Sequence, residues 1–345
     1  MKDPTADRAD LDATSPLQGG PGTPLYGSFF GLSDAPFDLT PNPRFVFLAG
    51  RHREVLSNLR YALASSKGFT LVLGDAGTGK TTLVRVAMAG LADTTNRYVL
   101  VNNPTLGRTE FYEFLAREFG MSAEAARSKT RFLAELQREV EARFAVGGLT
   151  GLIVDEAQSM PHELLEEIRL LGNIETSTTK LLNIVLCGQP ELADRLNDPS
   201  LRQLKQRVAL RCELRPLTLS ETASYISGRL RIAGGAPAEI FTRDAVIAIF
   251  EGSSGIPRTI NVIADNALIS AFAAHVKPVP VEIVDEVCRD FDLGQYTDTA
   301  PDAAGYAPGA GPRALGNGTG QGLTADGAVS SPLASPPKRR FSFFS

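Results

Sequence analysis

The stretch "GDAGTGKT" at residues 74–81 has the residue types and spacing to hold the phosphate groups of a nucleotide. It fits the pattern G-x-x-x-x-G-K-[ST], in which glycines let the backbone turn and point its N–H groups at an anion. Lys80 would neutralise the β and γ phosphates, and the Thr81 hydroxyl would bind Mg²⁺. An apolar run before the loop predicts a strand, and the residues after it predict a helix whose positive end faces the phosphates. The expected nucleotide-binding residues are Gly74, Asp75, Ala76, Gly77, Thr78, Gly79, Lys80, Thr81 and Thr82.

Two adjacent carboxylates in "GLIVDEAQ" provide a second component of a hydrolytic site. Asp155 and Glu156 follow an apolar run, so we expect them at the carboxyl end of a buried parallel strand, where open α/β sheets bind ligands. Asp155 would hold Mg²⁺ through water, and Glu156 would orient and deprotonate the attacking water. Gln189 follows the next apolar run and could contact the γ-phosphate or the water. Asn102 and Asn103 end another strand and could restrain Glu156.

Apolar runs that alternate with helical patterns place these motifs in one α/β domain. Strands are predicted at 68–74, 97–103, 150–157 and 181–188, with helical patterns between them. Nearly continuous apolar strands favour a parallel sheet covered by helices on both faces, which is a three-layer α/β fold. After "RCELRPL" (211–217) only helical patterns follow. The predicted organisation is therefore a disordered tail over 1–24, an α/β nucleotide-binding domain over 25–214, a small all-helical lid domain over 215–293 and a disordered Gly/Pro/Ser-rich tail over 294–345.

Composition narrows the functional class. The chain has 345 residues, 43% of them hydrophobic, which is enough for the cores of two domains, and its formal net charge is −4. This acidic balance predicts no general attraction to nucleic acid or to anionic membranes. The three cysteines and three histidines are scattered, which favours neither a zinc site nor a disulfide framework and fits a reducing cytosol. No apolar stretch has the form of a signal peptide or of a bilayer span, so we expect a cytoplasmic protein.

The last residues, "KRRFSFFS", differ from the tail around them. Lys338, Arg339 and Arg340 precede three phenylalanines, a composition typical of a short docking peptide or of a weak membrane tether. A solvated tail without a role of its own is the alternative interpretation.

With these residues placed, the chain resembles the AAA+ ATPases and, within them, the ExeA/GspA family of general secretion pathway protein A-like ATPases. That family includes ATPases found beside exosortase and exopolysaccharide gene clusters. The resemblance covers roughly residues 26–293, and it implies a P-loop fold, ATP and Mg²⁺ as ligands, and a homo-oligomer. The motifs that carry it are "FFGLSDAPFDLTPNPRFVFL", "HREVLSNLRYAL", "GFTLVLGDAGTGKTTL", "VNNPTL", "GLIVDEAQSMP", "LLNIVLCGQPEL", "LRQLKQRV" and "GIPRTIN".

The resemblance also implies roles for individual residues. Gln189 matches the sensor-1 position, and Arg258 in "GIPR" matches the sensor-2 arginine of the helical lid. Arg207 in "LKQRV" matches the arginine that reaches the γ-phosphate of a neighbouring subunit, where its positive charge would stabilise the transition state. Arg202 is the competing candidate for that role. The adenine side of the family's site corresponds to the segment around Pro36, Phe37 and His52.

The implied function is Mg²⁺-dependent ATP hydrolysis that drives conformational change in a secretion or exopolysaccharide and envelope-assembly system, with proteins of that system as partners and nucleic acid not expected. Many family members continue into a membrane-spanning segment and a peptidoglycan-binding domain. The sequence after residue 293 has neither pattern, which favours a cytoplasmic ATPase. The alternative is a nucleotide-gated, DNA-associated ATPase of the transposition or replication-initiation type. It is kept open by a basic run consisting of Arg202, Lys205, Arg207, Arg211 and Arg215.

A third interpretation is a regulatory switch that binds ATP and barely turns it over. The intact Glu156 argues against this switch, because a carboxylate at that position serves hydrolysis rather than storage.

Overall fold

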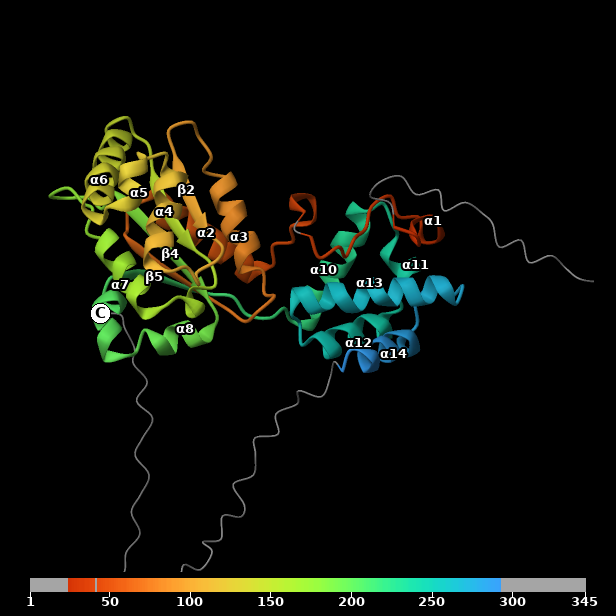
Figure 1. The fold of residues 1–345 in the computed structure, drawn as a ribbon. Helices are drawn as coiled ribbons and strands as arrows, with labels where there is room; N and C mark the ends of the chain where they lie inside the picture. The colour runs from red at the N-terminus through yellow and green to blue at the C-terminus, as the bar shows by residue number, and fades with distance from the viewer. Residues whose placement is uncertain (1–23, 41, 293–345) are drawn as a thin grey trace, which may run out of the picture. The chain divides into compact units, whose positions relative to one another are not determined.

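The computed structural model describes residues 24–40 and 42–292 (Figure 1). Apart from Pro24, the tails predicted over 1–24 and 294–345 lie outside the described residues, and so does the "KRRFSFFS" segment. None of the helices within the described residues is long and apolar enough to cross a membrane.

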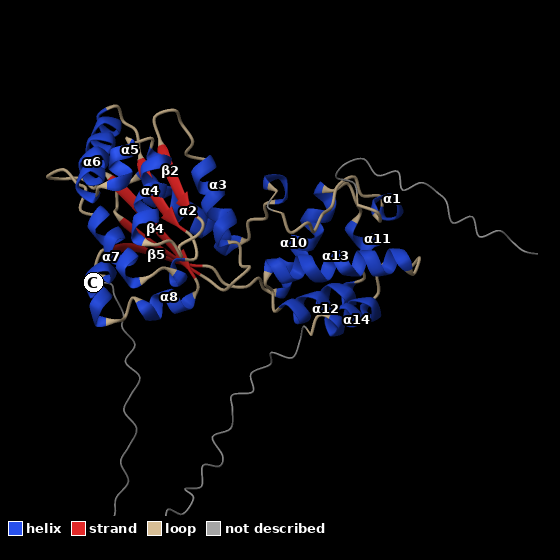
Figure 2. Cartoon of the chain, in the orientation of Figure 1, coloured by secondary structure: helices blue, strands red, loops and turns tan. Residues whose placement is uncertain are grey.

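A five-stranded sheet, entirely parallel, forms the centre of the α/β region (Figure 2). Its strand order is β2-β3-β4-β1-β5, so β1 and β3 lie on either side of β4. Four strands lie where the sequence predicts them, and the predicted three-layer α/β fold is confirmed. The strands are β1 (Phe69–Leu73), β2 (Arg97–Val101), β3 (Thr150–Val154), β4 (Leu182–Gly188) and β5 (Val208–Glu213).

The sequence did not predict β5. This strand lies at the sheet edge and pairs with β1 alone, and most of its side chains are partly or fully exposed. Because β5 is not buried on both faces, it carries polar residues among its apolar ones. It therefore lacks the continuous apolar run that marks the central strands.

Helices cover both faces of this sheet because successive strand side chains point to opposite sides. Val72 and Ile153 pack in one core with α2 and α3, whereas their neighbours Leu71 and Leu152 pack in a second core with α4, α6 and α7. Both sets are buried, which explains the near-continuous apolar strands. The helices are α2 (Gly50–Ala64), α3 (Lys80–Ala89), α4 (Arg108–Phe119), α5 (Ala123–Arg127), α6 (Lys129–Ala145), α7 (His162–Leu171), α8 (Pro190–Arg195) and α9 (Arg202–Lys205), with short 3₁₀ turns η2 (Ala157–Ser159) and η3 (Pro199–Leu201).

A helical region follows the sheet and has a core of its own. Its first helix begins with the capping box that the sequence indicates: the Thr218 side chain accepts from the Glu221 N–H at 3.3 Å, and the Glu221 carboxylate accepts from the Thr218 N–H at 3.0 Å. The helices are α10 (Leu219–Ile232), α11 (Pro237–Ile240), α12 (Arg243–Ser253), α13 (Pro257–Ala273) and α14 (Val281–Asp290).

The segment 26–49 packs with the helical region, although the sequence analysis assigned it to the α/β region. It contains α1 (Gly27–Phe30) and the 3₁₀ turn η1 (Pro43–Phe45). Its buried side chains, among them Tyr26, Phe37 and Phe45, belong to the same core as α10–α14. Hydrophobic patterning marks such residues as core but does not say which core they join.

Arg229 on α10 fastens this segment to the helical region. Its side chain is buried, its Nε donates to the Pro36 carbonyl, and its Nη1 donates to the Phe45 carbonyl at 3.5 Å and to the Tyr225 hydroxyl at 2.8 Å. The guanidinium also lies over the rings of Phe45 and Tyr225, 5.1 and 5.2 Å from their centroids. Hydrogen bonds from a charged donor are stronger than neutral ones, so we expect this one side chain to hold much of the segment in place.

We predict that Arg229→Met lowers the free energy of unfolding by about 2–4 kcal/mol, because it leaves buried carbonyl groups without donors while keeping the apolar stem. Urea denaturation followed by circular dichroism measures the effect. Arg231→Met, at an exposed position of the same helix, is the control and should cost no more than about 0.5 kcal/mol. Equal losses for the two variants would contradict the role assigned to Arg229.

Candidate active site

The loop 74–81 joins the end of β1 to the start of α3 at the carboxyl edge of the sheet. Gly77 and Gly79 have φ angles of +80° and +97°, in the left-handed region that favours glycine. A Cβ at Gly77 would also lie 2.8 Å from the Cβ of Arg258. The loop therefore needs glycine for its turn and for the close approach of α13. The unpaired N–H groups at the start of α3 face the loop and suit an anion.

Lys80 and Thr78 are anchored inside this loop. The Lys80 side chain is buried, and its ammonium donates to the carbonyls of Gly74 at 2.7 Å and Asp75 at 3.0 Å. The Thr78 hydroxyl donates to the Asp75 carbonyl at 2.8 Å, and the Thr78 carbonyl lies 3.2 Å from Nε2 of His52. The loop is thus preformed around a buried positive charge.

Thr81 and Asp155 come together from α3 and from the end of β3. The Thr81 hydroxyl donates to Oδ2 of Asp155 over 2.5 Å, and Asp155 as a residue is 6% exposed. Proteins usually bind Mg²⁺ with only a few oxygen ligands of their own, and phosphate groups and water supply the others. A hydroxyl and a carboxylate are suitable protein ligands of this kind. These residues therefore fit the ion that the sequence predicts.

Glu156 follows Asp155 in a left-handed conformation, with a φ of +51°. This conformation is uncommon for a residue other than glycine and tends to occur at functional sites. Its Oε2 accepts from Nε2 of Gln158 at 2.6 Å. Among the described residues, Gln158 binds this carboxylate, while the Asn103 side chain binds Thr105 instead. A carboxamide two positions after Glu156 in "DEAQ" was the available signal for Gln158.

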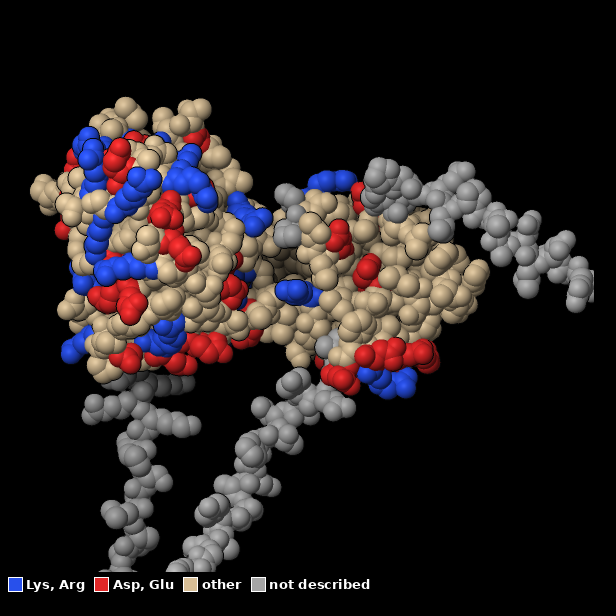
Figure 3. Space-filling model, in the orientation of Figure 1, with Lys and Arg blue, Asp and Glu red and all other residues tan. Residues whose placement is uncertain are grey.

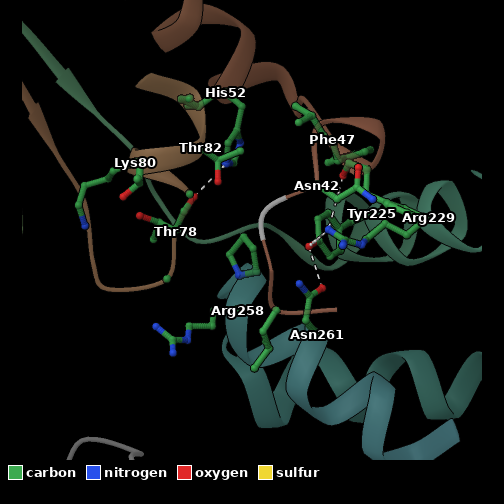
Figure 4. A pocket seen from close by; sticks show the side chains of 18 of the residues that line it. Asn42, Phe47, His52, Thr78, Lys80, Thr82, Tyr225, Arg229, Arg258 and Asn261 are labelled. Carbon is green, nitrogen blue, oxygen red and sulfur yellow. Dashed lines mark hydrogen bonds between the residues drawn. The ribbon is translucent and has the colours of Figure 1, made fainter. Parts of the chain in front are cut away.

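A cavity of about 360 Å³ lies over the phosphate loop (Figure 4). Its wall combines the loop, the segment that precedes α2, and helices α10 and α13. Of the predicted residues, it brings together Gly77, Thr78, Gly79, Lys80, Thr81, Thr82, Glu156 and Arg258. Sequence reasoning missed several lining residues, including Asn42, Phe47, Tyr225, Arg229 and Asn261. Asn42, Phe47 and Asn261 stand within quoted family motifs, but those motifs are far apart in the sequence, so local pattern could not show that these residues meet.

Arg258 reaches the cavity from the first turn of α13. Its backbone N–H donates to the Gly77 carbonyl at 3.3 Å, which joins the helical region directly to the phosphate loop. Its side chain is exposed and points away from α13 toward the loop side of the cavity (Figure 4).

Of the other predicted residues, several do not line this cavity. Gln189 is linked to it indirectly, because its N–H donates to Oε1 of Gln158 at 3.1 Å. Arg207 lies outside, where its Nη1 donates to the Arg169 carbonyl on α7 at 2.8 Å, and Arg202 is exposed. Phe37 is buried in the core of the helical region, whereas His52 lines the cavity.

Two members of the basic run of residues 202–215 are engaged in local contacts with other side chains. Lys205 binds the Asn197 side chain at 2.5 Å, and Arg215 forms an ion pair with Glu213 at 3.2 Å. On the face shown in Figure 3, basic and acidic side chains are interspersed over the α/β region.

The surroundings of His52 disfavour its protonated form. Burial lowers the pKa of His52, and this effect outweighs the opposing influences of the Thr78 carbonyl and of Glu221. Its Nδ1 is buried without a hydrogen-bond partner in the described part of the chain. A proton on this ring would therefore place an unsatisfied charge beside the phosphate loop.

We predict that His52 weakens the fold in acid. Because its pKa is lower in the folded state, the unfolded chain takes up the proton first as pH falls below about 6.5. The stability that neutral His52 contributes is thus complete above that pH and is lost toward the folded-state pKa. Urea denaturation at pH 5.5 and 7.5 should show a smaller pH effect for His52→Gln than for the wild type. His275→Gln, at an exposed position, is the control. A difference in unfolding free energy between the two pH values that is as large in His52→Gln as in the wild type would contradict the prediction.

Comparisons with known proteins agree with this geometry. A family model described as "AAA domain" matches residues 62–196. General secretion pathway protein A of Aeromonas hydrophila is 40% identical over 250 residues, which cover 72% of this chain and 45% of that protein. The chain thus spans less than half the length of this relative.

Solved structures share the fold at low identity. The ORC2 protein of Aeropyrum pernix, in ADPNP and ADP complexes, is 17% identical with a TM-score of 0.56, over 74% of this chain and 70% of that one. Drosophila ORC bound to DNA is 20% identical with a TM-score of 0.58, over 85% and 70%. Cdc6p of Pyrobaculum aerophilum is 20% identical with a TM-score of 0.58, over 74% and 70%. From its sheet, its phosphate loop and its 40% identity to the Aeromonas protein, we conclude that the chain belongs to the AAA+ ATPases and is an ExeA-like member of them.

Proposed function

We propose that this protein hydrolyses ATP with Mg²⁺ and that hydrolysis moves its helical region as a lid. The observation that carries the proposal is the hydrogen bond between Thr81 and Asp155. Asp155 is followed directly by Glu156, which lines the cavity over the phosphate loop. The proposal is supported because a hydroxyl, a carboxylate that could hold the ion and a candidate base are close together. Adjacent carboxylates of this kind suit hydrolysis better than storage of the nucleotide.

The chemical roles follow from the geometry. The loop N–H groups would bind the phosphates, and the Lys80 ammonium would exchange the carbonyls of Gly74 and Asp75 for phosphate oxygens. Thr81 and Asp155 would hold Mg²⁺, which supplies positive charge to the phosphate oxygens. Glu156 would accept a proton from the water that attacks the γ-phosphorus, as the bond between that phosphorus and the bridging oxygen of ADP breaks.

The lid movement is supported by the contacts of α13. The Arg258 backbone N–H bonds to the Gly77 carbonyl, and its exposed side chain could meet a γ-phosphate. Segment 26–49 shares the core of α10–α14, so it would move with the lid and carry part of the cavity wall with it. Loss of the γ-phosphate would remove one contact between the loop and α13 and so favour opening.

Replacement of Lys80 by Ala should abolish ATP binding, because the buried positive charge is removed from the phosphate loop. Glu156→Gln should bind ATP but lower kcat by about 10²–10⁴-fold, as expected for loss of a general base. A fluorescent ATP analogue measures binding, and phosphate release measures turnover. Lys67→Ala, at an exposed position before β1, is the control. Wild-type turnover by Glu156→Gln would show that another group is the base.

The site would be completed by an arginine of a neighbouring copy, in a homo-oligomer whose assembly responds to nucleotide. Arg207 is the candidate because it lies outside its own cavity, held by the α7 carbonyl of Arg169. Arg202, which is exposed, is the competing candidate.

Arg207→Ala should bind ATP normally but lose turnover, whereas Arg202→Ala should stay near wild type. Mixing Arg207→Ala with Lys80→Ala should restore part of the activity, because the Lys80 variant can lend its intact Arg207 to a neighbour whose own loop is intact. Steady-state phosphate release across mixing ratios provides the measurement. Absence of any rescue would count against action between subunits.

The proposed client is a secretion or exopolysaccharide and envelope-assembly complex, served from the cytoplasm. The support for it is the 40% identity to general secretion pathway protein A over 72% of this chain.

A further inference from the structure

Gln158 connects the candidate base to a second loop of the site. Its Nε2 donates to Oε2 of Glu156 at 2.6 Å, and its Oε1 accepts from the Gln189 N–H at 3.1 Å. The partners determine the orientation of the amide: a carboxylate only accepts and a backbone N–H only donates, so a flipped amide would lose both bonds.

The turn that carries Gln158 is fastened to α8 as well. The Arg195 guanidinium donates to the carbonyl of Gln158 and, at 2.8 Å, to that of Met160. Gly188, at the end of β4, leaves the space that the amide occupies, since a Cβ there would lie 2.9 Å from Oε1 of Gln158. Hydrogen bonds therefore join the turn η2 both to the loop that follows β4 and to α8.

Glu156 depends on this anchor. Its backbone is in the strained left-handed region, and its Oε2 is bound by Gln158, while no other described residue donates to its Oε1. Glu156 lines the cavity, where its second oxygen could meet a water molecule. Without the amide, the side chain would be free to rotate about its own bonds and to leave this direction.

We propose that Gln158 is a positioning residue that aims Glu156 at the attacking water and ties it to the loop of Gln189. This inference rests on the proposed ATPase function. A shift of the Gln189 loop toward a γ-phosphate would be passed to Glu156 through one side chain. Gln158 itself contacts no reacting atom, and its effect would be on turnover rather than on nucleotide binding.

The substitution Gln158→Glu removes the donor half of this link and places a second carboxylate beside Glu156. Glutamate keeps the shape of the side chain and an oxygen for the Gln189 N–H, but it has no amide to donate to Glu156. We expect kcat to fall about 10- to 100-fold, in the range found for partners that orient a functional group, with KM and the Kd of a fluorescent ADP analogue unchanged within about twofold. Gln158→Ala, which loses both bonds, should lower kcat at least as much.

The matched control is Gln137→Glu. Gln137 on α6 is exposed and also donates to a glutamate, Glu141, at 2.8 Å, so the same change breaks a similar bond far from the site. Its kcat should equal that of the wild type. Thermal melting of each variant, without nucleotide, shows whether a loss of turnover comes from a damaged fold.

The outcomes separate the inference from the function on which it rests. Wild-type kcat in both Gln158→Glu and Gln158→Ala would overturn the positioning role while leaving the ATPase intact. A fall in kcat that is matched by a weaker Kd, or by a melting temperature well below that of Gln137→Glu, would show a structural role and also overturn it. A wild-type protein that hydrolyses no ATP would overturn the proposed function, and the inference with it.

Discussion

The hydrogen bond between Thr81 and Asp155 is the contact on which the site depends. It can form because β1 and β3 are parallel and flank β4, so the loop after β1 and the acids after β3 emerge at one edge of the sheet. A parallel sheet brings its carboxyl ends together in this way, whatever the distance between the strands in sequence. The loop, the candidate ion ligands and the candidate base all emerge at one edge of the sheet because of that arrangement.

The helical region adds what the sheet cannot provide. The sheet edge presents the loop and the acids, but the wall opposite the loop comes from α10, α13 and the segment before α2. Arg229 holds the Pro36 carbonyl 193 positions away in sequence, which makes that segment part of the helical core. The cavity is therefore bounded by residues that belong to two cores.

Polar groups at the carboxyl edge of the sheet connect two loops of the candidate site. The carboxylate of Glu156, the amide of Gln158 and the N–H of Gln189 form a single chain of hydrogen bonds from β3 to the loop after β4. Partly buried bonds of this kind are strong and directional because little water competes for them. A displacement at one loop therefore has a physical route to the candidate base.

The sequence by itself determined the strands β1 to β4, the phosphate loop and the acids at 155 and 156, because each rests on local pattern: an apolar run, glycine spacing, or a charge after a strand. It did not determine β5, whose edge position removes the apolar run, or the place of segment 26–49, whose aromatics suit either core. Asn102 and Asn103 were candidates to restrain Glu156, whereas the hydrogen bond to its carboxylate comes from Gln158. Only the tertiary structure could decide such points, because they depend on which surfaces meet, and hydrophobicity drives burial without choosing the partner.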